Sequence, residues 1–236
     1  MADTDLTAII PVFNDRVALE RAIPRSIGAL SAISDNFELV VAEDGSTDGS
    51  RELIQYYEQQ DTRIRLLHSD KRLGRGRALN RAVTGSRGKI VCYYDVDLAT
   101  DMQHLPELIK AIENGADVAT GSRLLPNSDT LRTGGREIAS RTFNFLVRII
   151  LGSRVYDHQC GFKAFRRDKI LSVLATIQAG HWFWDTELLV RCQRKGFSVK
   201  EFPVRWRAGK GTTVKPKDVI GMGSSIVRLW WQLHVP

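Results

Sequence analysis

Two aspartates separated by a single residue follow an apolar run near the middle of the chain. The run Val91–Tyr94 is typical of a buried strand, and Asp95 and Asp97 come directly after it. Two carboxylates at this spacing repel each other unless a cation compensates them. A divalent cation would meet this need. A solvated strand end that caps the next helix is the simpler alternative, and the pair alone does not decide between the two.

A second acidic loop, Glu43–Ser50, follows the apolar run Phe37–Ala42. Strands are expected at 7–13, 37–42, 63–67, 90–94 and 117–120, and helices at 15–30, 51–59, 76–84 and 105–113. This alternation predicts an α/β fold with a mainly parallel, Rossmann-like central sheet and helices on both faces. Ligands of such sheets bind at the carboxyl ends of the strands. The two acidic loops should therefore share one edge and form one polar site.

The pattern becomes less regular after residue 121. A helix is expected at 136–151, a strand at 161–166, a helix at 185–195 and a strand at 198–206. The sequence contains no repeat or linker that would divide its 236 residues, so 1–236 is predicted to be one domain. The three widely spaced cysteines match no zinc site or disulfide framework and indicate a reducing compartment. The short acidic start, Met1–Leu6, does not resemble a signal peptide.

The net charge of +7 is compatible with nucleic acid, an anionic membrane surface or phosphorylated substrates as partners. Arginines cluster at 72–77 and at 123–141. The end of the chain, 216–236, is predicted to form a helix that is apolar and rich in tryptophan. It could pack on the core or lie at a membrane surface, where Trp230 and Trp231 with Arg148, Arg154 and Arg228 would suit the interface.

A glycine-rich basic segment, Gly74–Asn80, raises the possibility of phosphate binding. It lacks the lysine and serine that end a P-loop, and it does not follow the first strand as a dinucleotide fingerprint would. Arg75 lies at the expected start of a helix, where free N–H groups and arginines attract phosphate.

Several motifs occur in a fixed order along nearly the whole chain. They are Pro11–Asp15 (PVFND), Val40–Ser50 (VVAEDGSTDGS), Gly74–Asn80 (GRGRALN), Asp95–Asp97 (DVD), Gly121–Arg123 (GSR), Asp157–Phe165 (DHQCGFKAF) and Trp184–Leu189 (WDTELL). In this combination the sequence resembles the family 2 glycosyltransferases, which have the GT-A fold. Within that family it is similar to the dolichyl- and polyprenyl-phosphate mannosyl- and glucosyltransferases.

The resemblance implies roles for individual residues around a nucleotide sugar. Pro11, Phe13 and Asp15 would line the pocket for the base and ribose, Asp44 would contact the base, and Arg75 would help bind the donor. Asp97, together with Asp95, would hold Mg²⁺ or Mn²⁺ on the donor diphosphate. Arg207 and Lys210 would belong to a loop that closes over the donor.

The acceptor implied by the resemblance is a dolichyl or polyprenyl phosphate. Arg123, Arg136 and Ser140 would hold its phosphate, and Asp185 would orient neighbouring groups. Arg136, Ser140 and Asn144 favour mannose from GDP-mannose, whereas Gln159–Phe162 (QCGF) is nearer to the relatives that use UDP-glucose. The chain would then be a catalytic domain working at the cytoplasmic face of a membrane, without a C-terminal anchor of its own.

The mechanism expected for a phosphate acceptor is inversion at the anomeric carbon without a general base. A phosphomonoester is largely a dianion at neutral pH, so it needs positioning rather than deprotonation. The main alternative is a hydroxyl acceptor on a glycan or glycolipid, for which Asp185 or Glu187 would serve as the base. Nucleic-acid binding without catalysis is not expected, because acidic loops repel a phosphodiester backbone unless metal intervenes.

Overall fold

The computed structural model describes residues 4–131, 134–207 and 216–235. Its main sheet has seven strands in the order β3-β2-β1-β4-β7-β5-β8. The strands are β1 (Leu6–Val12), β2 (Phe37–Glu43), β3 (Ile64–Leu67), β4 (Ile90–Tyr94), β5 (Val118–Ser122), β7 (Phe162–Arg166) and β8 (Val199–Pro203). All neighbours pair in parallel except β7, which runs antiparallel to both β4 and β5. The predicted α/β fold with a mainly parallel central sheet is confirmed.

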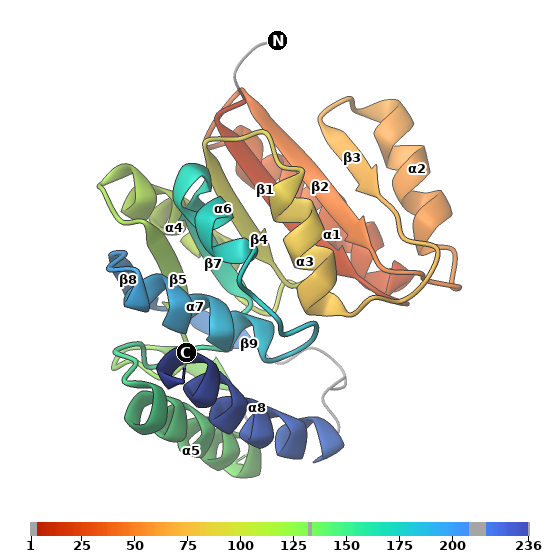
Figure 1. Ribbon diagram of the computed structural model, residues 1–236. Coiled ribbons are helices and arrows are strands. Elements are labelled where there is room, and N and C mark those ends of the chain that lie inside the picture. Colours follow the sequence, from red (N-terminus) through yellow and green to blue (C-terminus); the bar gives the residue numbers. More distant parts are fainter. Residues whose placement is uncertain (1–3, 132–133, 208–215, 236) are drawn as a thin grey trace.

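Helices cover both faces of this sheet (Figure 1). On one face lie α1 (Arg16–Ser31), α2 (Ser50–Gln60) and α4 (Leu105–Glu113), the last preceded by a short 3₁₀ turn, η1 (Met102–His104). On the other face lie α3 (Arg75–Thr84), α6 (Arg167–Leu174) and α7 (Trp184–Arg194). The strands supply both layers because successive side chains point to opposite faces. Ile9 and Tyr93 thus belong to one core, and Ile10 and Tyr94 to the other.

Two long helices pack against each other at one end of the molecule, α5 (Gly134–Leu151) and α8 (Pro216–His234). Met222, Ile226 and Leu229 of α8 are buried in the core, which confirms that the C-terminal segment packs as a helix. The opposite side of α8 stays exposed and carries Val227 and Trp231. None of the helices in the described ranges combines the length and apolar character that a membrane crossing requires.

The expected single strand at 198–206 is wrong. The structure divides it into β8 and β9 (Arg205–Arg207), and β9 pairs with β6 (Asp129–Leu131) in a separate two-stranded sheet. β8 ends at Pro203, which pairs with Ser122 at the end of β5, and the N–H of Val204 still donates to the carbonyl of Ser122 at 3.1 Å before β9 begins. Both β6 and α6 were missed by the sequence reasoning, because each is short and has no pronounced periodicity.

The register of the parallel strands brings the acidic loops to one edge. Val12 at the end of β1 pairs with Glu43 at the end of β2, and Ile9 pairs with Tyr93 near the end of β4. The loops that begin at Phe13, Asp44 and Asp95 therefore leave the sheet side by side. This confirms that the two acidic loops share one edge.

Candidate active site

Asp95 is held in place by an arginine and by the backbone beside it. The Arg75 guanidinium donates to Asp95 Oδ1 from Nε at 3.2 Å and from Nη2 at 2.8 Å. The backbone N–H of Asp95 donates to the carbonyl of Gly161 at 3.1 Å. A Cβ atom on Gly161 would lie 1.9 Å from Asp95 Oδ2, so only glycine leaves room for this carboxylate. Asp95 therefore has a fixed position and a cationic partner within the protein.

Asp97 is exposed, whereas Asp95 is partly buried. Its Oδ1 accepts the N–H of Ala99 at 3.0 Å, and the intervening Leu98 takes a positive φ of 51° that turns the loop sharply. Desolvation by the surrounding loops raises the pKa of Asp97, and the nearby carboxylates of Asp95 and Asp15 raise it further. A cation at Asp97 would relieve this crowding of negative charge.

These residues fit a divalent metal that takes part of its coordination from elsewhere. Within the described residues, no three histidine, cysteine, aspartate or glutamate side chains are grouped as a complete protein site. Mg²⁺ typically binds one or two carboxylates and completes its shell with substrate phosphates and water, and Mn²⁺ accepts the same hard oxygen ligands. Asp97 can supply such a ligand. Asp95 Oδ1 is already bonded to Arg75, so joint coordination by both aspartates stays a prediction.

Arg75 connects this acidic loop to a buried network. Its Nη1 donates to Asp185 Oδ2 at 2.6 Å, and Lys163 Nζ donates to Asp185 Oδ1 at 3.2 Å. The hydroxyl of Tyr93 also donates to Asp185 Oδ1. Burial raises the pKa of Asp185, but Lys163 and Arg75 outweigh it and leave that pKa below its ordinary value. Asp185 is thus a buried anion whose two oxygens already accept hydrogen bonds.

The sequence reasoning assigned Asp185 and Arg75 but missed Lys163 and Tyr93. Lys163 is completely buried in β7 between apolar neighbours. A buried lysine is unfavourable unless it is paired. A lysine within the apolar run Phe162–Phe165 was therefore a signal that a carboxylate lies nearby.

Two backbone N–H groups at the start of α3 already donate to a backbone carbonyl elsewhere in the protein. The N–H groups of Gly76 and Arg77 donate to the carbonyl of Gly180 at 3.0 Å and 3.3 Å. These are the groups that a phosphate would use at a helix N-terminus. These two N–H groups are therefore engaged within the protein, and phosphate binding through the side chain of Arg75 stays a prediction.

The residues expected to line the base pocket lie along the edge of β1 and β2. Pro11 is buried in β1, and the Arg72 guanidinium lies 3.9 Å from the ring centroid of Phe13. Asp15 caps α1 by accepting the N–H of Ala18 at 3.3 Å. The Arg72 guanidinium thus lies over the Phe13 ring, and a flat base could stack beside them.

Asp44 shapes the loop that leads to Arg75. Its two oxygens accept the N–H groups of Leu73 and Gly74, each at 2.8 Å, and only 3% of the residue is exposed. Glu43 accepts from the N–H of Ser46 and bonds to the His68 ring. Both acids therefore hold loop backbone, and contact between Asp44 and a base stays a prediction.

The residues expected to hold the acceptor phosphate are only partly brought together. Arg123 donates to Asp157 in bidentate fashion, from Nε at 2.6 Å and from Nη2 at 2.8 Å. The Ser140 hydroxyl is buried without a hydrogen-bond partner in the described part of the chain. Asn144 donates to the carbonyl of Ser140 at 2.9 Å. The backbone of Arg136 belongs to α5, but its side chain lies outside the described residues.

The segment after Asp97 is tied to β9. The N–H of Arg207 donates to the carbonyl of Ala99 at 2.8 Å, and the N–H of Asp101 donates to that of Arg205 at 3.0 Å. Arg207 itself pairs with Asp129 at 2.5 Å. Lys210, expected in the same loop, lies outside the described residues. The position of the Asp97 loop is thus coupled to the strand that precedes residue 208.

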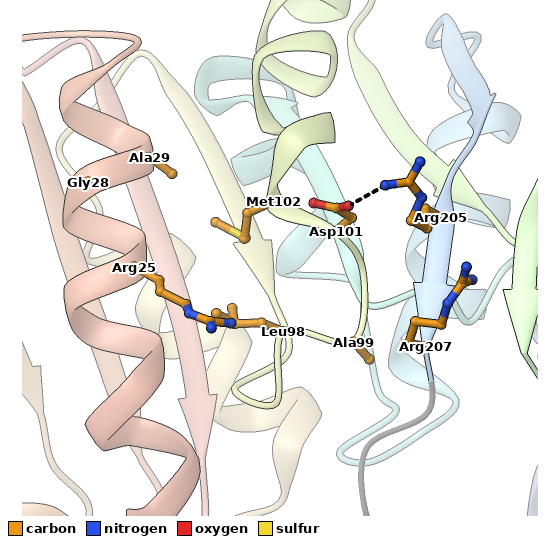
Figure 2. Close-up of a pocket in the computed structure, with 9 residues that line it drawn as sticks. All are labelled: Arg25, Gly28, Ala29, Leu98, Ala99, Asp101, Met102, Arg205 and Arg207. Atoms are coloured by element: carbon orange, nitrogen blue, oxygen red, sulfur yellow. Dashed lines mark hydrogen bonds and ion pairs between the residues drawn. The ribbon is translucent and has the colours of Figure 1, made fainter.

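A cavity of about 520 Å³ lies between α1 and β9, against the segment that follows Asp97. Figure 2 shows Arg25 reaching from α1 toward Leu98, with Arg205 and Arg207 on the opposite wall. The complete lining is Arg25, Gly28, Ala29, Leu98, Ala99, Asp101, Met102, Arg205 and Arg207. The cavity therefore borders the candidate site without containing Asp95 or Asp97.

Comparison with known proteins defines the class to which this fold and site belong. The family model described as glycosyl transferase family 2 matches residues 7–174, which is more than half of the chain. The chain belongs to this family, and the predicted resemblance is confirmed. The coarse function that follows is that of a glycosyltransferase.

Two curated relatives extend the likeness over almost the whole chain. Glycosyltransferase AglD from Haloferax volcanii is 45% identical over 238 residues, covering 99% of this chain and 38% of the relative. The chain therefore spans well under half of that protein. The dolichyl-phosphate beta-glucosyltransferase of Dictyostelium discoideum is 30% identical over 239 residues, covering 95% of this chain and 73% of the relative.

Solved structures support the GT-A fold. Glucosyl-3-phosphoglycerate synthase from Mycobacterium tuberculosis, solved with Mn²⁺, UDP and glucosyl-3-phosphoglycerate, has a TM-score of 0.67 and 21% identity. That match covers 98% of this chain and 80% of the other. The mannosyltransferase PcManGT from Pyrobaculum calidifontis, solved with GDP-Man and Mn²⁺, has a TM-score of 0.61 and 16% identity over 88% of this chain and 57% of the other.

Proposed function

We propose that this chain is the catalytic part of an enzyme that transfers a hexose from a nucleotide sugar to a polyprenyl phosphate at a membrane surface. The observation that carries the proposal is the accessible carboxylate of Asp97. It lies close to Asp95 and Asp15 at the edge where the carboxyl ends of β1, β2 and β4 meet. Ligands of parallel sheets bind at this edge.

Mg²⁺ or Mn²⁺ is the proposed cofactor, with Asp97 as its protein ligand. A metal bound there would offset the negative charge that develops on the leaving nucleoside diphosphate. Arg75 neutralises Asp95 and keeps the two carboxylates from repelling each other at full strength. The remaining protein contribution is orientation: the loop after β4 is fixed by Gly161 on one side and by β9 on the other.

The proposed donor is UDP-glucose, with GDP-mannose as the alternative. GDP-mannose was favoured by the pattern of Arg136, Ser140 and Asn144, and it stays a prediction. The 30% identical relative from Dictyostelium discoideum is named a dolichyl-phosphate beta-glucosyltransferase, which supports glucose. Calorimetric titration of both donors in the presence of Mn²⁺ distinguishes them. Tight binding of GDP-mannose but not of UDP-glucose would reverse this choice.

A phosphate acceptor is favoured over a hydroxyl because neither candidate base is available. Asp185 accepts bonds from Arg75, Lys163 and Tyr93 and is 3% exposed. Glu187 is equally buried and accepts the N–H groups of Gln178 and Ala179 as well as Arg191 Nε at 2.7 Å.

An attacking alcohol must lose a proton, whereas a phosphate dianion need not. The buried hydroxyl of Ser140, which has no hydrogen-bond partner among the described residues, is proposed to hold the acceptor phosphate together with Arg123 and Arg136.

Inversion at the anomeric carbon follows from the same arrangement. A retaining reaction through a covalent intermediate needs a free nucleophilic carboxylate beside the sugar. Asp185 and Glu187 are both engaged in buried hydrogen bonds, so direct in-line attack by the acceptor phosphate is proposed. Arg75, held by Asp95 and Asp185, would then orient the donor.

The proposed membrane-facing surface is the exposed side of α5 and α8. We call it the α5–α8 face and define it by Ile138, Phe145, Ile149, Val227 and Trp231, each of which is more than half exposed. Arg154 and Arg228 are exposed near it, whereas Arg148 is half-buried against the ring of Tyr156. Apolar side chains with nearby arginines match the chemistry of an anionic membrane surface.

The proposed function is tested by comparing three acceptors. Purified protein with Mn²⁺ and a radiolabelled donor is given a polyprenyl phosphate, the corresponding polyprenol, or a glycolipid with free hydroxyls. Label should enter the organic phase only with the phosphate. Transfer to the polyprenol or glycolipid, and not to the phosphate, would overturn the proposed acceptor and restore the hydroxyl alternative.

A further inference from the structure

We propose that Lys163 is a positioning residue for the metal–nucleotide site: it compensates Asp185, so that Arg75 can hold Asp95. The proposal rests on the function proposed above. Lys163 is not expected to touch the donor, the acceptor or the metal. It acts through two intermediate side chains.

The burial of Lys163 is the first observation. It lies in β7, an interior strand between β4 and β5, and none of its surface is exposed. Its ammonium donates to Asp185 Oδ1 at 3.2 Å and to the carbonyl of Cys160. An ammonium group is costly to bury, and an apolar side chain at the same position would avoid that cost. We therefore look for the role of the buried Lys163 ammonium in the neighbouring Asp95–Asp97 site.

The second observation is the alternation of charges from the core to the surface. Lys163 pairs with Asp185, Asp185 with Arg75, and Arg75 with Asp95. The exposed fraction of the side chains is 0% for Lys163 and 43% for Asp95. Two cations thus balance two carboxylates, and the series ends beside Asp97.

Arg75 divides its donors between the two carboxylates. Its Nη1 donates to Asp185, while its Nε and Nη2 donate to Asp95. Without Lys163, the buried charge of Asp185 would be matched by Arg75 alone. Buried charges interact more strongly than partly hydrated ones. The guanidinium would therefore move toward Asp185, and its hold on Asp95 would weaken.

A second route leads from Lys163 to Asp95 through the backbone. The carbonyl of Cys160, which accepts from Lys163, precedes Gly161. Gly161 in turn accepts the N–H of Asp95 and provides the space for its carboxylate. Lys163 thus fixes both the charge partner and the backbone on which Asp95 rests.

The test measures binding of UDP and of GDP, each with Mn²⁺, by calorimetry and by electron paramagnetic resonance of the metal. Lys163→Met should weaken binding about ten- to a hundredfold, the usual cost of removing an outer partner of a metal site. The matched control is Lys200→Met, which alters an exposed lysine on β8 of the same sheet and should bind like the wild type.

A purely structural role would leave nucleotide binding unchanged once the variant is folded. Wild-type affinity for Mn²⁺–UDP and Mn²⁺–GDP in a folded Lys163→Met variant would overturn the proposal.

The double variant Lys163→Met/Asp185→Leu guards against loss of folding. Replacing a buried ion pair by apolar side chains is often neutral for stability. This variant should fold and recover part of the binding that Lys163→Met loses, because no buried Asp185 charge draws Arg75 away from Asp95. Binding as weak as that of Lys163→Met by the folded double variant would contradict the inference alone. Failure of the wild type to bind either nucleotide would instead contradict the proposed function and, with it, the inference.

Discussion

The Arg75 guanidinium donates to Asp185 at 2.6 Å, although the two residues are 110 positions apart in the sequence. The contact joins the start of α3 to the first turn of α7, next to the loop that carries Asp95 and Asp97. It also takes one oxygen of Asp185, while Lys163 and Tyr93 bond to the other. A carboxylate with this environment is suited to hold Arg75 rather than to accept a proton from a substrate.

Asp185→Asn should lower stability strongly and transfer only moderately. Loss of one member of a buried charge network costs about 3 to 5 kcal/mol, because its partners remain buried without compensation. The lowered pKa of Asp185 fixes the pH dependence: its stabilisation is complete above its ordinary pKa and is lost as the pH falls through the depressed value. The stability deficit of the variant should therefore shrink in acid.

Urea unfolding at several pH values measures this deficit, and the pH profile of transfer is recorded in parallel. Glu187→Gln is the companion variant, since Glu187 is the other buried acid in the first turn of α7. Loss of transfer as severe as for Asp97→Ala from either change, together with removal of the acidic limb of the profile, would identify a general base and favour a hydroxyl acceptor.

Asp97→Asn should make the metal-free protein slightly more stable at neutral pH. A carboxylate whose pKa is raised by folding destabilises the folded state above that pKa, and this penalty disappears as the pH falls through it. Removing the charge removes the penalty. Thermal unfolding in the presence of a chelator tests this expectation.

Asp35→Asn is the matched control for this measurement, because Asp35 is exposed at the opposite edge of the sheet, before β2. Its melting temperature should equal that of the wild type. A lower melting temperature for Asp97→Asn than for the wild type would show that the Asp97 charge is compensated within the protein and does not call for a cation.

Gly161→Ala should impair the site at the point where the backbone approaches Asp95. The added Cβ would lie 1.9 Å from Asp95 Oδ2, so the carboxylate must move away from its present position. Mn²⁺–UDP binding should fall by about tenfold or more. Gly223→Ala in α8 is the control, since its Cβ would meet no atom within 4 Å and alanine favours the helix. Equal affinity in both variants would show that the position of Asp95 does not matter for binding.

Ile149→Glu and Trp231→Glu should detach the protein from anionic vesicles. Both side chains belong to the α5–α8 face and are 64% and 60% exposed. Each change removes an apolar contact and adds a charge that anionic lipid repels, so binding should fall about tenfold or more.

Vesicle flotation measures the bound fraction, and Val17→Glu is the control, because Val17 is 69% exposed on α1, away from this face. An equal effect of all three changes, or no binding by the wild type, would contradict the assignment of the face.

The N-terminal half of the fold was predictable because its signals are local. Apolar runs and turn-forming residues mark strands and helices directly, and the predicted β4 and α4 match the structure at both ends. The C-terminal half depended on contacts between distant residues. Nothing in Phe162–Arg166 itself indicates that β7 enters antiparallel between β4 and β5.

The same limit applies to the site. The sequence predicted the position of the Asp95–Asp97 loop, because an apolar strand precedes it. It did not predict which residues bond to these aspartates. Arg75 lies 20 residues from Asp95 and 110 from Asp185, and the packing of β4 against β7 and of α3 beside α7 brings them together. Spacing along the chain does not encode such contacts. Only the buried lysine within an apolar strand hinted at the network.

Sugar transfer by the wild type and by Asp97→Ala shows directly whether Asp97 holds the metal that the reaction needs. Each protein is incubated with labelled UDP-glucose or GDP-mannose, Mn²⁺ and a polyprenyl phosphate, after circular dichroism has established that both are folded. We expect a polyprenyl-phosphate sugar from the wild type and at least about a hundredfold less from the variant, because the proposed metal ligand is gone. Equal transfer by a folded Asp97→Ala at saturating Mn²⁺ or Mg²⁺ would contradict the role proposed for Asp97.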